Sequence, residues 1–439
     1  MYCKIIIKKL KAKNSKIKYN YTMENWVAVI DLKAYYATFE CLERGLDPFT
    51  TPLAVTDTTR KESTIVLSVS PYLKSLGVPS RCRRRDLPNN IKGMIYAVPQ
   101  MEKYVKKSAE VVSIMLDFVG RDDIHVYSID ESFLNIGPYL KLNKCGPVEF
   151  CKKILTSIKE KTGLIGTCGI GPNMFLAKVA DDKEAKYNKD YIALWNYKDV
   201  ENKLWPIKPL DEIWGISHGF KKRLNALGLY CVGDVAKYNK ELLIKEFGIL
   251  GEDIYEHCNG RDDASIREKY IPVNKNLSLG QVLMRDYSKD EAELIIKEMV
   301  DELCFRLRQT KLKARGVSLF IRYSFSSKDE PFAHQLRLTN PTDLNSELQE
   351  ALLYIYKNYV SPNGLIRQIG ISYGSLVEAK TMQVSLFKNL ESLDKEESMY
   401  KAIDEIQKKY GKNSILKGTS LLKESTIKER HNQIGGHRK

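Results

Sequence analysis

The sequence predicts an α+β protein of several domains. Its 439 residues exceed the roughly 100–200 residues of an ordinary domain. Strand and helix patterns alternate in the first half, over about 26–195, as strand, helix, strand, strand, helix, strand. A second β-α-β-β-α-β order follows over 274–380, after a region of short helices. Two to four domains are therefore expected from a chain of this length.

The first predicted strand is an apolar run that stops at a charge. The letters WVAVI from Trp26 are typical of a strand buried on both faces, and the run ends at Asp31. Apolar residues then recur at helical spacing, at Leu32, Tyr35, Tyr36, Phe39 and Leu42.

The rest of the first half contains a small insertion and two further strand–helix patterns. Prolines and glycines interrupt residues 44–98, which hold the basic run RCRRR at 81–85. Helices are predicted at about 100–118 and 147–161. Two short β-like runs, VYSID and ESFLNI, meet at Asp130 and Glu131, and the strand GTCGIG precedes the helix NMFLAKVADDKEAK.

The second half begins with short helices separated by glycines over 207–260, and the lysines there favour a module that binds a nucleic-acid backbone. A helix opened by a capping box of Ser288 and Glu291 is predicted to run to about Thr310. Two strands, a helix and a last strand complete this domain. The residues beyond are helical around 396–410, then basic and glycine-containing.

Composition narrows the function classes. Lys and Arg outnumber Asp and Glu by 70 to 55, a net charge of +15, which favours a polyanionic partner, although ribosomal or membrane-surface binding explains it equally well. No apolar run approaches the roughly 20 residues of a membrane-spanning helix. Nine cysteines without a C-x-x-C pair, and no secretory signal, predict a reduced cytoplasmic protein. The six histidines have no zinc-site spacing, so oxygen ligands must hold any metal.

Three carboxylates carry the candidate chemistry. Magnesium requires oxygen ligands, of which proteins usually supply two or three carboxylates. Asp31, Asp130 and Glu131 meet that need if their strands are neighbours, and two ions could then act on a phosphoryl transfer. For any one of them alone, a helix cap or a surface charge is the simpler interpretation.

The contexts DLKAYYATFE and SIDESFL, in this order, resemble the Y-family, or translesion, DNA polymerases. The resemblance continues through Gly169-Ile170-Gly171, Asn173 and the segment from Leu176 to Lys178, and it covers about 24–385. The segment SPYLKSLGVPSRCR is most similar to the bacterial DNA polymerase V catalytic subunits, in particular those of Gram-positive bacteria.

The resemblance implies a right-hand polymerase fold. Its implied parts are a basic N-terminal arm at 1–23, a palm at 24–43 and 99–195, small fingers at 44–98, a helix-hairpin-helix thumb at 196–262, a linker at 263–273, a β-α-β-β-α-β little finger at 274–380, and a tail at 381–439 with a clamp-binding motif. It also implies template-directed, low-fidelity DNA synthesis past damaged bases, in DNA repair and the SOS response.

Site roles follow from the same resemblance. Asp31, Asp130 and Glu131 would bind two Mg²⁺ ions, with the carbonyl of Leu32 as a further ligand. Tyr36 matches the steric gate under the incoming sugar; the alternative is a core aromatic. Two lysines would contact the triphosphate or remain solvated surface lysines: Lys74 and Lys186. Many relatives carry a nucleotide-contacting tyrosine where this chain has Pro71, with Tyr72 beside it.

The DNA and partner contacts are implied as well. The glycine turn over 213–219 resembles a helix-hairpin-helix, with a plain structural turn as the alternative; its candidates are Gly215, Ser217 and Gly219. Basic candidates in the little finger are Lys275, Arg285, Arg315 and Arg322. Gln383, Leu386 and Phe387 fit the bacterial sliding-clamp pentapeptide. Expected partners are primer-template DNA, deoxynucleoside triphosphates, the sliding clamp, and a recombinase or other accessory proteins. The protein is expected in the cytoplasm, at the nucleoid when active.

Two other classes compete with a polymerase. Palm-domain nucleotide cyclases also use strand-borne carboxylates and two metals, but they lack the helix-hairpin-helix and the second sheet domain. A catalytically inactive DNA- and clamp-binding protein with a polymerase fold is the other alternative, and the intact acidic trio argues against it. The chain has no G-x-x-x-x-G-K-[ST] loop for nucleotide-driven motor work and no recognisable proofreading segment.

Overall fold

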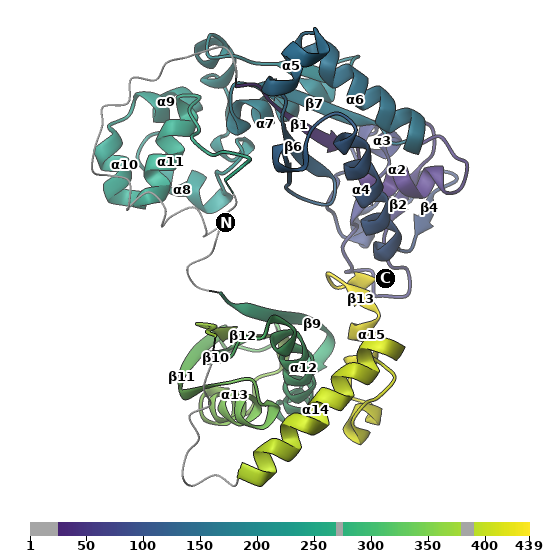
Figure 1. Cartoon of the computed structure of the whole chain (residues 1–439), viewed down its shortest axis with the longest axis vertical. Coiled ribbons are helices and arrows are strands. Elements are labelled where there is room, and N and C mark those ends of the chain that lie inside the picture. The colour runs from purple at the N-terminus through teal and green to yellow at the C-terminus, as the bar shows by residue number, and fades with distance from the viewer. Residues whose placement is uncertain (1–24, 269–274, 379–389) are drawn as a thin grey trace. The chain divides into compact units, whose positions relative to one another are not determined.

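The computed structural model describes residues 25–268, 275–378 and 390–439 (Figure 1). The chain divides into two compact units, Met1–Tyr270 with His437–Lys439, and Ile271–Gly436. The predicted basic arm at 1–23 lies outside the described residues. Among the described residues, no helix is both long and apolar enough to cross a membrane.

A five-stranded sheet forms the centre of the first unit. β1 is antiparallel to β6 and β7, β6 is antiparallel to β5, and β7 is parallel to β8. The strands, in their order across the sheet, are β5 (Ile124–Val126), β6 (Glu131–Asn135), β1 (Val27–Leu32), β7 (Gly166–Gly171) and β8 (Ile192–Leu194).

Helices cover both faces of this sheet. α7 (Met174–Lys183) packs on one face, and α6 (Pro147–Thr162) packs on the other with α4 (Met101–Leu116) beside it (Figure 1). Val29 of β1 packs with α7, whereas Ile30 lies on the side of α6. Because side chains alternate along a strand, Asp31 shares the face of Val29 and is directed toward α7.

A glycine allows α7 to lie against the sheet. A Cβ atom at Gly169 would lie 2.0 Å from the carbonyl oxygen of Ala177 and 2.4 Å from the nitrogen of Asp181. α7 begins after Asn173, whose side chain accepts a hydrogen bond of 2.8 Å from the Leu176 nitrogen. The motif GIGPN therefore fixes both the position and the start of this helix.

The insertion forms a small sheet with its own core. β2 pairs with β3 antiparallel and with β4 parallel. Val66, Val69 and Leu73 are buried in this core. The elements near it are α2 (Tyr35–Leu42), β2 (Leu53–Val55), β3 (Ser68–Val69), α3 (Pro71–Ser75), η1 (Arg84–Asp86) and β4 (Ile95–Ala97).

Short helices follow the sheet, as the glycine pattern predicted. Their core is continuous with Phe175 and Leu176 of α7, so this helical region packs on the sheet domain. The helices are α8 (His218–Ala226), α9 (Val232–Lys237), α10 (Lys240–Phe247) and α11 (Ile249–Cys258), and the remaining short elements of the unit are η2 (Arg121–Asp123), α5 (Gly137–Asn143), η3 (Ala185–Tyr187), η4 (Val200–Leu204) and η5 (Leu210–Glu212).

The second unit confirms the predicted β-α-β-β-α-β order. Its sheet is antiparallel throughout, with the strand order β11-β10-β12-β9. The capping box of Ser288 and Glu291 is present at the start of α12. The elements are β9 (Leu277–Tyr287), α12 (Lys289–Thr310), β10 (Ala314–Tyr323), β11 (Phe332–Thr342), α13 (Asn345–Tyr359) and β12 (Ile366–Gly374).

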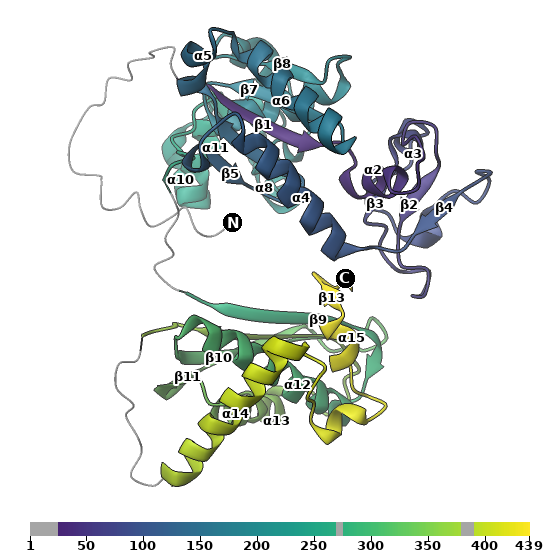
Figure 2. The same ribbon diagram turned by 45° about the vertical axis from the view of Figure 1, so that its right-hand side comes forward.

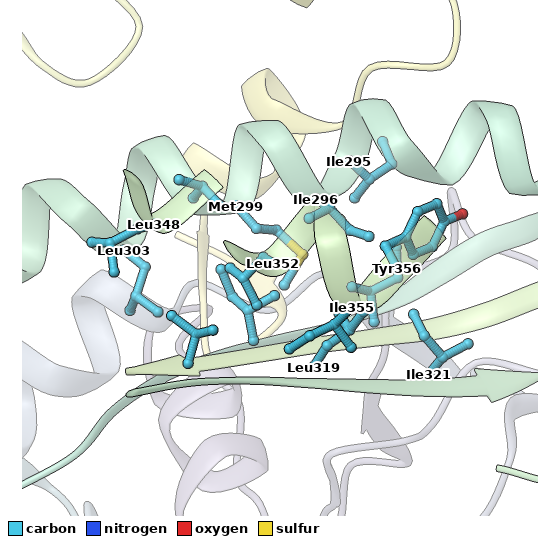
Figure 3. Packing of buried hydrophobic residues seen from close by; sticks show 14 of the residues in the cluster. Ile295, Ile296, Met299, Leu303, Leu319, Ile321, Leu348, Leu352, Ile355 and Tyr356 are labelled. Carbon is cyan, nitrogen blue, oxygen red and sulfur yellow. The ribbon is translucent and has the colours of Figure 1, made fainter. Parts of the chain in front are cut away.

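The core of this unit lies between its two helices and one face of the sheet (Figure 3). Side chains of α12 and α13 interdigitate above β10; those labelled in Figure 3 include Ile295, Met299, Leu303, Leu348, Leu352 and Leu319. The opposite face of the sheet is therefore free to hold polar and small side chains.

The C-terminal residues fold onto α12. The predicted helix at 396–410 is observed as α14 (Leu390–Tyr410), which Figure 2 shows in yellow-green, and Arg308 of α12 donates two hydrogen bonds of 2.8 Å to Asp404. Arg430 contacts Glu302 at 2.9 Å. The residues beyond α14, which the sequence described only as basic and glycine-containing, form η6 (Gly418–Leu421), α15 (Ile427–His431), β13 (Gln433–Ile434) and β14 (His437–Arg438).

Candidate active site

The strand register brings two of the predicted carboxylates together. Asp31 of β1 is the direct Cα partner of Glu131 in β6. Paired residues on neighbouring antiparallel strands have Cβ atoms roughly 4.5–5.5 Å apart. Asp130 precedes Glu131, and its carbonyl oxygen accepts a hydrogen bond of 2.9 Å from the Leu32 nitrogen. The predicted residues Asp31, Leu32, Asp130 and Glu131 thus meet at one end of two adjacent strands.

Asp130 lies in the bend that leads into β6. The Ser128 hydroxyl donates a hydrogen bond of 2.7 Å to the Asp130 carboxylate and accepts one of 3.1 Å from the Glu131 nitrogen. Burial raises the pKa of Tyr36, and the charge of Asp130 raises that pKa further. The Asp130 carboxylate therefore lies close enough to the first turn of α2 for its charge to affect Tyr36.

Two lysines lie against the carboxylates and offset their negative charge. Lys178 of α7 is only 5% exposed, and its ammonium group contacts Glu131, Asp182 at 3.0 Å and Asp31 at 3.7 Å. Lys186, which the sequence predicted at the triphosphate, is held by Asp31 and Asp182, each at 2.7 Å.

Sequence reasoning missed part of this constellation. It used Lys178 only as part of a resembling segment, and it did not single out Asp181 or Asp182. The available signal was the spacing of Lys178, Asp182 and Lys186, because residues four apart share a helix face. Their closeness to Asp31 depends on the packing of α7 against Gly169, which the spacing alone does not give.

The electrostatics of the site favour an added cation. Burial raises the pKa of Glu131 to about 7; the opposing charge of Lys178 lowers this pKa, and that of Asp31 raises it. Burial also raises the pKa of Asp181 to about 6. Bringing carboxylates together at the end of a sheet thus costs free energy, which positive charge beside them offsets.

Two sets of carboxylates compete as metal ligands. Asp31, Asp181 and Asp182 each offer an oxygen within 4.8 Å of the others. However, Asp181 is fully buried and accepts a hydrogen bond of 2.6 Å from the Thr167 hydroxyl. Magnesium keeps several of its waters when it binds protein, so a half-exposed carboxylate suits it better than a fully buried one. Asp31, Asp130 and Glu131 are half-buried, and their oxygen donors fit a hard divalent cation.

Tyr35 and Tyr36, adjacent on α2, differ in their surroundings. Tyr35 is 1% exposed and donates a hydrogen bond to the Tyr104 carbonyl at 2.5 Å. Tyr36 is half-buried, and the charges of Asp130 and Arg81 act on its hydroxyl group. Of the two rings, Tyr36 is the one presented toward the acidic end of the sheet.

In the insertion, α3 carries Lys74 and the departure at Pro71. Partial desolvation lowers the pKa of Lys74, and the charges of Asp31 and Asp130 raise it, so this lysine at the surface of the insertion lies within electrostatic reach of the carboxylates. Pro71 is the first residue of α3, after Ser70 as its N-cap. Tyr72 packs against the core of the insertion.

The predicted glycine turn lies at the start of α8. Gly215 has φ +96°, a left-handed conformation that glycine adopts without strain. Ser217 is the N-cap, and its hydroxyl accepts a hydrogen bond of 3.4 Å from the Phe220 nitrogen. Gly219 is the second residue of the helix. The three predicted residues thus surround one helix N-terminus, where backbone N–H groups attract phosphate.

In the second unit, the face of the sheet opposite the helices carries small and polar residues together with Phe320 and the exposed Val282. Val317, Leu319 and Ile321 are buried against the helices, so their neighbours in β10 point the other way. We call this opposite surface the bare face; it includes Gly280, Gly316, Ser318, Arg322, Arg337, Gln368, Gly370 and Ser372.

The predicted basic residues of this unit differ in their availability. Arg322 is exposed on the bare face, and so is Arg337, a residue the sequence did not single out. Arg285 is engaged with Glu291 at 2.8 and 3.1 Å. Arg315 lies at the strand irregularity between Ala314 and Gly316, and Lys275 precedes β9; both are exposed. Gln383, Leu386 and Phe387 lie outside the described residues.

Comparison with known proteins agrees with this geometry. Residues 30–182 match the model of the impB/mucB/samB family, and residues 274–386 match that of its C-terminal domain. The chain is 32% identical to the putative UV-damage repair protein UvrX of Bacillus subtilis, over 94% of this chain and 97% of that protein. It is 27% identical to DNA polymerase IV 2 of the same organism, over 95% of this chain and 99% of that protein.

A solved structure shares the fold. The Y-family DNA polymerase chimera Dbh-Dpo4(243-245)-Dbh superposes with a TM-score of 0.64 at 18% sequence identity, covering 81% of this chain and 100% of the chimera. The strand-borne carboxylates, the matched family models and this fold lead to one conclusion. The chain belongs to the impB/mucB/samB family and is a Y-family translesion DNA polymerase of the Gram-positive type.

Proposed function

We propose that Asp31, Asp130 and Glu131, with the Leu32 carbonyl, hold two Mg²⁺ ions for DNA synthesis. The observation that carries this proposal is the direct pairing of Asp31 with Glu131, next to the bend at Asp130. When bound, the two ions would activate the primer 3′-hydroxyl and stabilise the pyrophosphate leaving group. The carboxylates bind and orient, and no side chain is required as a general base.

Lys186 and Lys74 bind the triphosphate in this proposal. Lys186 is 32% exposed at its side chain and follows α7, so its ammonium group can leave Asp31 for a phosphate oxygen. Lys178 is 7% exposed at its side chain and stays beside Glu131 and Asp182 as a fixed positive charge. Lys74 adds positive charge from the insertion, which serves as the fingers at 44–98.

Tyr36 serves as the steric gate against ribonucleotides. Its half-buried ring near Asp130 supports this role, because a sugar positioned over the carboxylates would meet that ring. Replacing Tyr36 by alanine will admit ribonucleotides. If Tyr36→Ala still rejects them, Tyr36 is a core aromatic and no gate.

The DNA lies along three surfaces in this proposal. The sheet domain at 24–43 and 99–195 is the palm, and the helices at 196–262 are the thumb, which binds a phosphate at Gly215, Ser217 and Gly219. After the linker at 263–273, the unit at 274–380 is the little finger. Its bare face approaches the duplex because its glycines and serines leave room for a backbone, and Arg322, Arg315 and Lys275 supply charge.

The tail at 381–439 provides the clamp contact. Gln383, Leu386 and Phe387 bind the bacterial sliding clamp, and burial of the two apolar side chains contributes roughly 3–6 kcal/mol before ordering costs. In this proposal the enzyme copies past damaged bases with low fidelity. It acts in the cytoplasm, at the nucleoid, and a recombinase or other accessory proteins license its activity. Replacing Leu386 and Phe387 by alanine will remove clamp stimulation while sparing synthesis on bare DNA.

Primer extension tests the catalytic proposal. Asp130→Asn keeps the shape of the side chain and removes its charge, so the variant will bind primer-template DNA yet add no nucleotide. Asp190→Asn, at an exposed turn of the same unit, is the matched control and will extend the primer like the unmodified chain. Unchanged incorporation by Asp130→Asn would remove Asp130 from the active site. Damaged and undamaged templates, compared in parallel, test lesion bypass.

A further inference from the structure

A group of four aromatic rings joins α2 to α4, and Tyr36 is its outermost member. Three rings come from α2 and one, Tyr104, from α4. The ring centroid of Tyr104 lies 4.9 Å from that of Tyr36 and 5.2 Å from that of Phe39, with the second pair nearly perpendicular. Tyr104 thus lies behind Tyr36 at the distance of a direct aromatic contact.

Tyr104 is fixed at both ends. It is fully buried, and its hydroxyl donates a hydrogen bond of 2.5 Å to the carboxylate of Glu40. At the other end, its backbone carbonyl accepts the hydrogen bond of the Tyr35 hydroxyl at 2.5 Å. Its ring therefore cannot swing aside or withdraw without breaking the buried hydrogen bond to Glu40.

Glu40, which anchors Tyr104, is itself fully enclosed. Its side chain is 0% exposed, accepts a hydrogen bond of 3.1 Å from the Gln100 amide, and forms an ion pair with Arg44. A buried carboxylate with several partners has one strongly preferred position. The chain of contacts from Glu40 through Tyr104 thus extends a rigid support to the ring of Tyr36.

A ring excludes a 2′-hydroxyl only if it cannot move aside. Tyr36 is half-buried at the end of the group, so the ring behind it decides whether it can retreat. We propose that Tyr104 is a positioning residue that holds the Tyr36 ring in place and so sets the discrimination between deoxyribose and ribose. This inference rests on the proposed gate role of Tyr36.

The size of the effect follows from the ring contact. Loss of one aromatic pair changes the equilibrium between two ring positions about two- to twelvefold. In Tyr104→Leu, the ratio of kcat/KM for deoxynucleotides to that for ribonucleotides will fall by about this factor. The change will appear as a lower KM for the ribonucleotide, while kcat for the deoxynucleotide stays unchanged, because Tyr104 does not touch the reacting atoms.

Two further variants separate the ring from the hydroxyl. Tyr104→Phe keeps the ring and will retain most of the discrimination. Tyr104→Met replaces the ring by an unbranched, flexible side chain that can adapt to the space left, and it provides the same measurement as Tyr104→Leu if the leucine variant does not fold. Tyr356→Leu is the control for general destabilisation, since Tyr356 is 1% exposed and donates a hydrogen bond of 2.5 Å in the other unit.

Steady-state insertion of single nucleotides by the full chain gives the result, with Tyr36→Ala measured alongside. A loss of discrimination in Tyr104→Leu or Tyr104→Met, with Tyr104→Phe and Tyr356→Leu close to the unmodified chain, supports the inference. Unmodified discrimination in the two ring-deleting variants, while Tyr36→Ala admits ribonucleotides, overturns it and leaves the gate standing. Continued rejection by Tyr36→Ala instead refutes the gate itself.

Discussion

Removing Arg322 and Arg337 together will flatten the salt dependence of DNA binding. Both side chains are exposed on the bare face of the second unit. Each neutralised phosphate adds about −0.9 to the slope of log K against log salt for duplex DNA. Two lost contacts reduce the slope by about 1.8. Between roughly 50 and 200 mM salt, the affinity of the double variant will therefore fall about twelvefold less than that of the unmodified chain.

Fluorescence anisotropy of a labelled primer-template, measured at several salt concentrations, gives the two slopes. Arg285→Ala is the matched control: this arginine, also predicted from sequence to contact DNA, is already engaged with Glu291. Its removal will leave the slope nearly unchanged. An unmodified slope in the double variant, or an equal reduction in Arg285→Ala, would refute the assignment of the bare face to DNA.

Three further predictions concern the framework of the two units. Burial raises the pKa of Glu302, but Arg430 and other cations outweigh it and hold this pKa at about 2; Glu302 thus contributes about 3 kcal/mol above pH ~4.5, lost as the pH falls toward 2. Glu302→Gln will remove this pH dependence of stability, measured as the free energy of opening of α12 by amide hydrogen exchange. Gly169→Ala will destabilise the first unit by about 1–3 kcal/mol or more and abolish DNA synthesis, because the added Cβ meets the backbone of α7. Gly146→Ala, with open space around its Cβ position, will have neither effect. Thermal unfolding and primer extension measure the two effects. Ser288→Ala will destabilise the start of α12 by about 1 kcal/mol, because the helix loses its N-cap. Faster amide hydrogen exchange in the first turn of α12 will show this loss.

Much of the fold could be predicted because its signals are local. The apolar run before Asp31, the capping box at Ser288 and the alternating strands of the second unit each specify one element through its own residues. These predictions rest on strand period and helix capping, which need no knowledge of distant contacts. That Asp31 and Glu131 lie together was expected only on the condition that their strands are neighbours, and the structure supplies that condition.

The rest depends on packing between elements distant in sequence. Lys178 reaches Glu131 only because α7 lies close to β7 at Gly169. Arg285 looks equivalent to Arg322 in the sequence, yet Arg285 has an acidic partner, Glu291, in the first turn of α12, whereas Arg322 has no ion pair with any residue that the structure describes. The folding of the C-terminal residues onto α12 likewise rests on ion pairs such as Arg430–Glu302, which span more than a hundred residues.

The most direct test of catalysis at Asp31, Asp130 and Glu131 is to count the metal ions bound when one member of each carboxylate set is replaced. Mn²⁺ can replace Mg²⁺ as a spectroscopic probe, and electron paramagnetic resonance counts the ions bound by the full chain with a chain-terminated primer-template and a deoxynucleotide. The unmodified chain and Asp182→Asn will bind two ions, and Glu131→Gln will bind fewer. Two ions in Glu131→Gln, together with a loss in Asp182→Asn, would contradict the assignment and move the metal site to α7.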